Sequence, residues 1–435
     1  MIGKLVGFDK RTASWRTEIV AGATTFLTMC YILVINPAIL GTTGMEKGAV
    51  FTATALASGI ATLLLAFLAR LPIALAPSMA LNAFFAFTLV EGMGYSWQTA
   101  MTAMFVEGVL FILITLLNIQ EVILNSIPVS LRYAISAGIG MFIAFVGLKN
   151  AGIIESNPST FVTLGVFTPA SILAFAGILL SGALTVLKVK GALFYSILGC
   201  TLLGIPLGVT QWPASFSLVA LPPSLAPTFA QFDFSELFTP EMGIVLFTLL
   251  FMNIFDTVGT LVGLTSKTGI MQPDGRVPRV KEVMLAASIG TTAGTLMGSS
   301  TISTFVESAA GIAEGGKTGL TAFTTGVLFL AALFFSPLFL LIPNAATTGA
   351  LVLVGVFMMD ALAKINLKEI AEALPAFLTL LLTLLTYSIA NGMIFGVLSF
   401  VGLKVATGRF KEVSPTLYIL AGLFILNYIW TAFGR

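Results

Sequence analysis

Long apolar stretches recur along almost the whole chain of 435 residues. Each of the clear stretches approaches the roughly 20 residues that a helix needs to cross the hydrocarbon core of a bilayer. They lie at residues 18–40, 50–69, 97–117, 132–148, 169–187, 191–210, 241–265, 283–298, 317–341, 345–362, 375–389, 391–407 and 416–433. Only 9% of the residues are charged, against about 25% in soluble domains. This pattern excludes a water-soluble globule and predicts an all-α polytopic protein embedded in the lipid bilayer.

Lysine and arginine residues fall mostly on one side of the predicted membrane. This holds if two interrupted apolar segments, 72–90 and 299–316, each count as one crossing. Basic loops face the cytoplasm, so we expect a cytoplasmic amino terminus in a multi-pass protein of the cell membrane. Residues 1–17 are too polar for the apolar part of a signal peptide, so the first span is expected to be retained.

Composition also limits the partners that we expect. The formal net charge of +2 is too small to indicate nucleic acid. Cys30 and Cys200 lie in apolar segments without the spacing of a metal site or a disulfide framework. We therefore expect no metal and no cofactor.

The two halves of the chain resemble each other. Ile127-Pro128 is followed by Gly140 and Phe142, and Ile342-Pro343 is followed by Gly355 and Phe357 at the same spacings. Residues 211–240 are rich in proline, lack lysine and arginine, and are expected to form an extracytoplasmic linker. If each half has seven crossings, an odd number, the halves have opposite orientations, as in many secondary transporters. The predicted units are a first repeat at 1–210 and a second at 241–435.

Each half contains one interrupted segment, third in order. The segment 72–90 has Pro72 and Pro77 in its first half, which resist a continuous helix. The segment 299–316 begins with a run of serine and threonine residues of low helix propensity. We predict a short extended stretch followed by a half-helix in both. Irregular backbone at membrane depth occurs where it lines a cavity, so the binding site is expected between the two segments.

Two acidic residues, Asp256 and Glu307, lie within these apolar surroundings. An ionisable group at membrane depth is costly and by default marks a substrate or ion pathway. The chain has no histidine, so proton coupling would depend on such carboxyl groups. A structural role for Asp256 and for Asn253, which share a helix face, is the alternative, because polar groups also hold spans together in lipid. Glu18 and Glu107 lie outside the broken segments, and we expect them to be structural or interfacial.

Six ordered motifs resemble the AzgA-like adenine, guanine and hypoxanthine permeases of the nucleobase/ascorbate transporter superfamily. The motifs are FDKRTASWRTE (8–18), TFLTMCYILVINP (25–37), APSMALNAFF (76–85), FDTVGTL (255–261), VESAAGIAEGGKTG (306–319) and YSIANG (387–392). This resemblance implies a non-enzymatic symporter that imports purine nucleobases with protons. It also implies about 14 spans in a 7+7 inverted repeat, one fewer than the fifteen stretches counted above. Either 416–433 lies along the membrane interface or two neighbouring stretches form one kinked span. Spans 1–4 and 8–11 would form a core domain, and spans 5–7 and 12–14 a gate domain.

The resemblance places substrate-binding residues at Asn82, Asp256 and Glu307, with Asp256 and Glu307 as the candidates for proton coupling. Many relatives have a second aspartate three residues before the one in span 8, where this chain has Asn253. The amide of Asn253 can hydrogen-bond to a base but cannot take up a proton. A flat purine also needs an apolar or aromatic wall, for which Phe84 and Phe305 are the candidates.

Other functions remain open at this level. A cation-coupled carrier of xanthine, uracil or another small heterocycle fits the same pattern, and sodium is an alternative to the proton. An anion carrier of related fold is a further alternative, although two carboxyl groups at the site disfavour it. An intramembrane prenyltransferase would need clustered aspartates, which are absent from the sequence. A homodimer is also compatible with this sequence.

Overall fold

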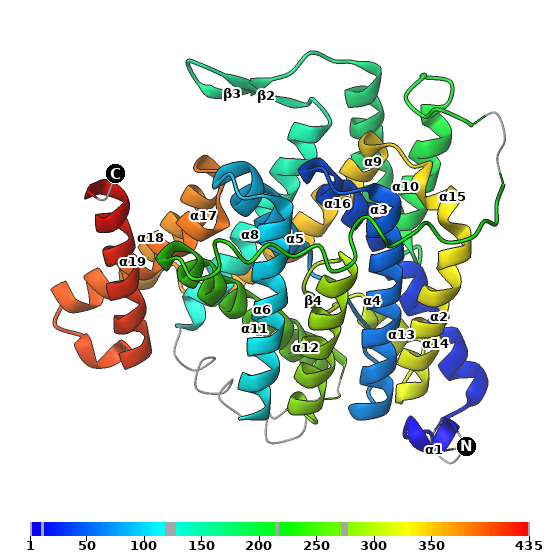
Figure 1. Ribbon diagram of the computed structural model, residues 1–435, viewed down its shortest axis with the longest axis horizontal. Helices are drawn as coiled ribbons and strands as arrows, with labels where there is room; N and C mark the ends of the chain where they lie inside the picture. The colour runs from blue at the N-terminus through cyan, green and yellow to red at the C-terminus, as the bar shows by residue number, and fades with distance from the viewer. Residues whose placement is uncertain are drawn as a thin grey trace.

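The computed structural model describes residues 2–9, 13–117, 128–213, 217–268, 270 and 277–433. The chain is mostly helical (Figure 1). The helices are α1 (Ile2–Leu5), α2 (Trp15–Met29), α3 (Ile32–Leu40), α4 (Lys47–Leu68), α5 (Met79–Ala83), α6 (Trp97–Leu116), α8 (Val129–Asn150), α9 (Pro169–Val186), α10 (Ala192–Gly204), α11 (Pro240–Thr268), α12 (Val280–Met297), α13 (Ser308–Ala313), α14 (Gly319–Ala332), α15 (Ser336–Leu340), α16 (Asn344–Met358), α17 (Ile370–Leu385), α18 (Ile389–Ala406) and α19 (Pro415–Phe433).

Short helices and strands connect these elements. A π-helix, η2 (Phe84–Gly92), continues α5, and 3-10 turns lie at η1 (Gly41–Thr43), η3 (Leu333–Phe335), η4 (Met359–Lys364) and η5 (Phe410–Glu412). The strands are β1 (Leu75–Pro77), β2 (Ile154–Asn157), β3 (Phe161–Leu164) and β4 (Ile302–Thr304). Strands β2 and β3 form an antiparallel hairpin at one end of the molecule (Figure 1).

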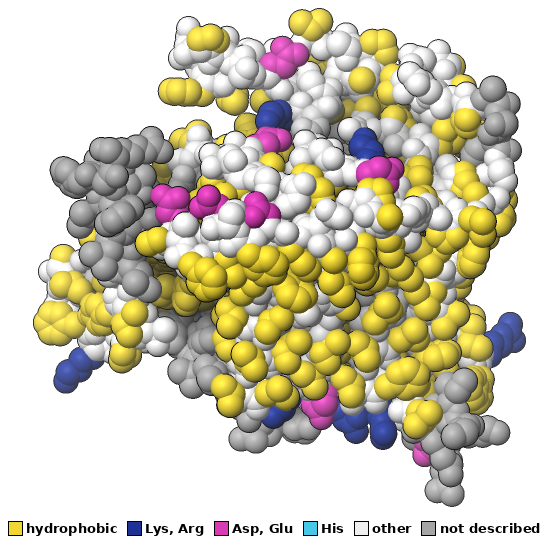
Figure 2. All heavy atoms as spheres, in the orientation of Figure 1, with side chains coloured by type: hydrophobic (Ala, Val, Ile, Leu, Met, Phe, Trp, Pro, Cys, Tyr) yellow, Lys and Arg dark blue, Asp and Glu magenta, His cyan; other side chains and the backbone are white. Residues whose placement is uncertain are grey.

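Eight helical segments in the described residues are long and apolar enough to cross a membrane. Figure 2 shows a broad band of hydrophobic side chains across one face of the molecule. A row of acidic side chains lies along its edge on the hairpin side, and most of the visible lysine and arginine side chains lie beyond the edge nearest the N-terminus. These features confirm a multi-pass membrane protein.

The helices form two packing groups. In the first group, α2, α3, α4, α6, α11, α12, α13 and α14 pack mainly with one another. In the second group, α8, α9, α10, α16, α17 and α18 do the same. Helices α8 and α16 cross at Gly140 and Gly355, where a Cβ on Gly355 would lie 2.5 Å from the carbonyl oxygen of Gly140. These are the glycines at matching positions of the sequence repeat, so equivalent helices of the two halves meet at equivalent residues.

The two interrupted segments meet in the first group. Strand β1 pairs antiparallel with β4, with Leu75 opposite Thr304 and Pro77 opposite Ile302. Helix α5 follows β1, and its first turn is capped by the Ser78 hydroxyl, which accepts the N–H of Leu81 at 3.4 Å. Helix α13 follows β4. The predicted extended stretch and half-helix are therefore confirmed in both segments.

The predicted linker runs across one end of the first group. Its described residues, 211–213 and 217–239, contain no helix or strand. The Pro223 carbonyl accepts from the Thr52 hydroxyl of α4 at 2.9 Å, and Ala230 N–H donates to the Leu296 carbonyl of α12 at 2.8 Å. The linker therefore covers helix ends in both halves of the chain (Figure 1).

Glu18 has the structural role that the sequence indicated. Its carboxylate is fully buried and accepts the backbone N–H groups of Lys317, Thr318 and Thr321 at 3.0–3.3 Å. The amino end of a helix attracts negative charge, so Glu18 of α2 stabilises the start of α14. This bond joins two helices of the first group.

Candidate functional site

A cavity of about 460 Å³ lies between the two packing groups. Its walls come from α11 and the turn before α13 in the first group, and from α8 and α16 in the second. Both acidic residues singled out in the sequence, Asp256 and Glu307, line it. Of the two interrupted segments, only 299–316 contributes lining residues, Val306 and Glu307, so the cavity lies beside that segment rather than between the two.

Asp256 is presented by α11. Its side chain is half-buried, and its Oδ2 atom accepts a hydrogen bond of 2.7 Å from the hydroxyl of Ser78. Ser78 is also the residue that caps α5. The carboxyl group is thus tied to the broken segment of the first half, although α11 belongs to the second half.

Glu307 directly precedes the first residue of α13 and lies two residues after Phe305. The Tyr31 hydroxyl donates a hydrogen bond to its Oε1 atom. Tyr31 is fully buried at the break between α2 and α3. Tyr31 was not predicted as a site residue. It lies within the motif at 25–37, but no polar partner at helical spacing distinguished it.

Asn82, Phe84 and Phe305 do not line the cavity. Asn82 is fully buried, and its Oδ1 accepts from the hydroxyl of Ser300, which comes from the opposite half. The Asn82 Nδ2 group has no hydrogen-bond partner among the described residues. Phe84 and Phe305 are 1% and 6% exposed.

Asn253 does not line the cavity either. It is fully buried on α11, where its Nδ2 donates to Glu107 of α6 at 3.0 Å. The Thr257 hydroxyl donates to Asn253 Oδ1 at 3.3 Å. The structure therefore places Asn253 between helices, in the arrangement that was the structural alternative for this residue.

The wall from the second group was not predicted. It includes Tyr133, Ser136 and Ile139 of α8 and Val354 and Phe357 of α16. Two aromatic rings and the hydroxyl groups of Tyr133 and Ser136 thus line the same cavity as the two carboxyl groups. The repeated Phe357 was visible in the sequence only as part of the repeat, because an apolar residue in an apolar helix gives no signal of its own.

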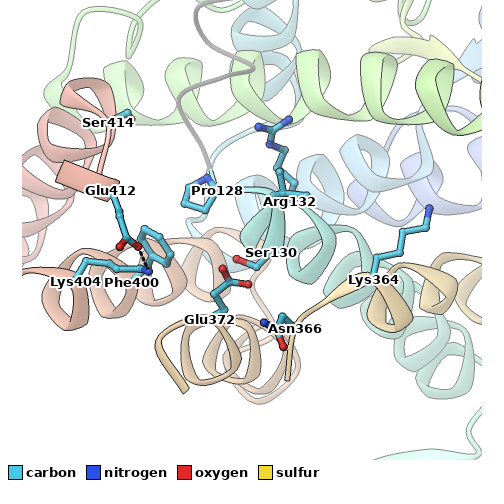
Figure 3. A pocket seen from close by; sticks show the side chains of 11 residues that line it. Pro128, Ser130, Arg132, Lys364, Asn366, Glu372, Phe400, Lys404, Glu412 and Ser414 are labelled. Carbon is cyan, nitrogen blue, oxygen red and sulfur yellow. Dashed lines mark hydrogen bonds and ion pairs between the residues drawn. The ribbon is translucent and has the colours of Figure 1, made fainter. Parts of the chain in front are cut away.

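A second cavity of about 410 Å³ adjoins the first. The two share Val129, Arg132 and Lys364, so these residues lie at their junction. The second cavity is more polar, and Figure 3 shows Arg132 and Lys364 extending away from Glu372 and Asn366. In the same cavity, the Lys404 ammonium donates a hydrogen bond to the Glu412 carboxylate. The first cavity thus continues into this second, charged cavity at the amino end of α8, which we call the vestibule.

The opposite end of the interface between the groups is closed by aromatic rings. Tyr387, from the turn before α18, lies against Phe87 of η2 and Phe142 of α8, with ring centroids 5.7 and 5.1 Å apart. Lys149 lies 4.5 Å above the Tyr387 ring and 3.9 Å from the carboxylate of Glu91. None of these residues lines the cavity.

Comparison with protein families gives a match over most of the chain. Residues 16–423 match the sequence model of the Permease family, Xan_ur_permease. The adenine permease AdeP of Escherichia coli is 40% identical over 431 residues, covering 99% of this chain and 96% of AdeP. The guanine/hypoxanthine permease PbuG of Bacillus subtilis is 42% identical over 435 residues, covering 97% of this chain and 98% of PbuG.

Solved structures of similar fold are more distant in sequence. The transmembrane domain of the cyanobacterial bicarbonate transporter BicA has a TM-score of 0.65 at 17% identity, covering 88% of this chain and 97% of that one. The murine Solute Carrier 26 family member A9 anion transporter, in an inward-facing state, has a TM-score of 0.60 at 12% identity, covering 89% and 69%. At these identities the likeness concerns the fold alone.

Proposed function

The chain belongs to the nucleobase/ascorbate transporter family of permeases, and from this membership and the site we propose that it imports purine nucleobases by proton symport. Adenine, guanine and hypoxanthine are the proposed substrates. The observation that supports this most directly is the pair of carboxyl groups, Asp256 and Glu307, on the wall of one cavity, with Asp256 inside a candidate membrane span. Relatives named for these bases match over their full length.

The two carboxyl groups suit a purine because its edge carries both donors and acceptors. We assign Asp256 and Glu307 to that edge, and the apolar and aromatic side chains of α8 and α16 to the face of the ring. Asn82, Phe84 and Phe305 would support the site from behind. A proton taken up by one of the carboxyl groups would travel with the base, since the chain contains no histidine.

The proposed architecture is a 7+7 inverted repeat with residues 211–240 as the extracytoplasmic linker. The first packing group would be the core domain and the second group the gate domain. The antiparallel pairing of β1 with β4 and the crossing of α8 and α16 at Gly140 and Gly355 support this symmetry. The basic edge near the N-terminus supports a cytoplasmic amino terminus.

Alternating access would be a movement of the core domain against the gate domain. The cavity continues into the vestibule at Arg132 and Lys364, whereas the other end is closed by Tyr387 and its aromatic neighbours. In the proposed orientation, this state is open toward the cytoplasm. Opening toward the outside would then require Phe87 of the core to separate from Tyr387 and Phe142 of the gate.

The substrate class can be tested with purified protein. We expect adenine, guanine or hypoxanthine to raise the melting temperature, because a ligand that binds only the folded state stabilises it in proportion to the logarithm of its concentration. Xanthine, uracil and sulfate are measured in parallel. Stabilisation by sulfate alone would reject the nucleobase assignment, and stabilisation by uracil or xanthine alone would reject the purine preference.

The coupling ion can be tested in cells or vesicles. Because the proposed proton carriers are carboxyl groups in the cavity, acidifying the outside relative to the inside should raise the initial rate of purine uptake several-fold. A protonophore should remove this stimulation. Purine uptake that depends on sodium and is unaffected by the protonophore would contradict proton symport.

A further inference from the structure

Glu107 is a buried acid without a positive partner among the described residues. It lies on α6 and is 0% exposed. Its Oε1 atom accepts the 3.0 Å hydrogen bond from Asn253, and its Oε2 atom has no partner in the described part of the chain. An ionised carboxylate left with one neutral donor in such surroundings carries a large desolvation cost. The arrangement therefore favours a neutral carboxylic acid.

Helix α6 is tightly packed at the residue next to Glu107. The neighbouring Gly108 lies against α12, where an added Cβ would come within 2.8 Å of the Thr292 hydroxyl oxygen. Helix α6 therefore has little freedom to move away from α12. The hydrogen bond that Asn253 donates to Glu107 therefore holds α11 against α6, which is itself packed tightly on α12.

This bond lies directly behind the candidate site. Asn253 and Asp256 are three residues apart on α11, with Asn253 facing α6 and Asp256 lining the cavity. The next residue, Thr257, bonds to Asn253 through its hydroxyl, and its carbonyl accepts from Thr304 of β4 at 2.8 Å. A continuous set of hydrogen bonds thus joins α6, α11 and the strand that precedes Glu307.

We propose that Glu107 is a positioning residue for the nucleobase site: as a neutral acid bonded to Asn253, it fixes the rotation of α11 that turns Asp256 into the cavity. Glu107 itself touches neither the cavity nor its carboxyl groups. This inference rests on the proposed function only for the identity of the ligand. The geometry of α11 can be measured without any ligand.

The test uses a reporter cysteine on the cavity face of α11. In full-length protein with Cys30→Ala and Cys200→Ser, Thr260→Cys is labelled with a small thiol reagent, and the rate is measured. Glu107→Leu should slow this labelling about twofold to tenfold, the equilibrium change that the loss of one hydrogen bond produces. Glu107→Gln keeps an acceptor for Asn253 and should leave the rate unchanged.

Matched controls separate rotation of α11 from general damage. Ser136→Cys reports from α8 on the opposite wall, and its labelling should not respond to Glu107→Leu. Asn253→Leu should slow Thr260→Cys labelling as Glu107→Leu does, and the double variant should slow it no further, because both changes remove the same bond. Unchanged labelling in Glu107→Leu, or additive effects in the double variant, would overturn the proposal.

Transport provides the second readout. Glu107→Leu should raise the half-saturation concentration for purine by a similar factor, whereas Glu107→Gln should match the wild type in both half-saturation and pH profile. A shifted pH profile in Glu107→Gln would show that Glu107 exchanges protons, which contradicts a fixed neutral acid. If the wild type binds no nucleobase but the labelling results hold, the proposed function fails while the positioning role stands.

Discussion

Glu307→Gln should abolish the accumulation of radiolabelled purine while leaving the protein folded and inserted in the membrane. Glutamine keeps the shape and an acceptor for the Tyr31 hydroxyl, so packing at the start of α13 should survive. It cannot take up a proton, and its NH₂ group presents donors where the carboxyl group presents acceptors. Because the variant loses both proton uptake and the acceptors presented to the base, accumulation should fall to the level of cells without the protein.

The measurement is uptake over time, normalised to the amount of protein in the membrane. Glu314→Gln is the matched control: it is the same substitution at the other end of α13, where the side chain is bonded to Lys190 instead of facing the cavity. That variant should transport at close to the wild-type rate. Accumulation by Glu307→Gln at the wild-type level would remove Glu307 from the site.

Much of the fold was predictable because lipid restricts the choices of a chain. Apolar stretches of membrane length become helices, since every backbone polar group must be satisfied within the segment. The exceptions were also visible, because prolines at 72 and 77 and the hydroxyl run before Glu307 disfavour a helix. The pairing of Leu75 with Thr304 was not predictable, because nothing local to either segment specifies its partner in the other.

Sequence reasoning pointed to the cavity through its charges and missed most of the residues that line it. Asp256 and Glu307 stood out because an acid among apolar residues has few structural explanations, and both line the cavity. Tyr31 and Phe357 gave no comparable signal, since aromatic residues are ordinary components of membrane helices. Asn253 was a candidate for the base because relatives have an aspartate at this position, yet one face of a helix is wide enough to direct Asn253 and Asp256 to different neighbours.

Asp256→Asn should separate binding from coupling. Asparagine can still accept the Ser78 hydrogen bond of 2.7 Å and still offers hydrogen bonds to a base, so purine should continue to stabilise the purified variant. It cannot exchange a proton, so net uptake against a gradient should be lost. Equilibrative exchange of labelled for unlabelled purine should continue, because this process needs no net proton movement.

Asp233→Asn is the matched control for this substitution. Asp233 lies in the linker, where hydrogen bonds from Ser235 and Thr99 hold the pKa of its carboxyl group below the ordinary value. It therefore stays ionised at the pH values of an uptake assay and cannot follow the proton gradient, so Asp233→Asn should remain concentrative. If Asp256→Asn accumulates purine like the wild type, Asp256 does not carry the coupling proton. Glu307 is then the one left of the two candidate carriers. If the variant loses binding as well as accumulation, the carboxylate of Asp256 is required to hold the base, and binding and coupling are not separable at this residue.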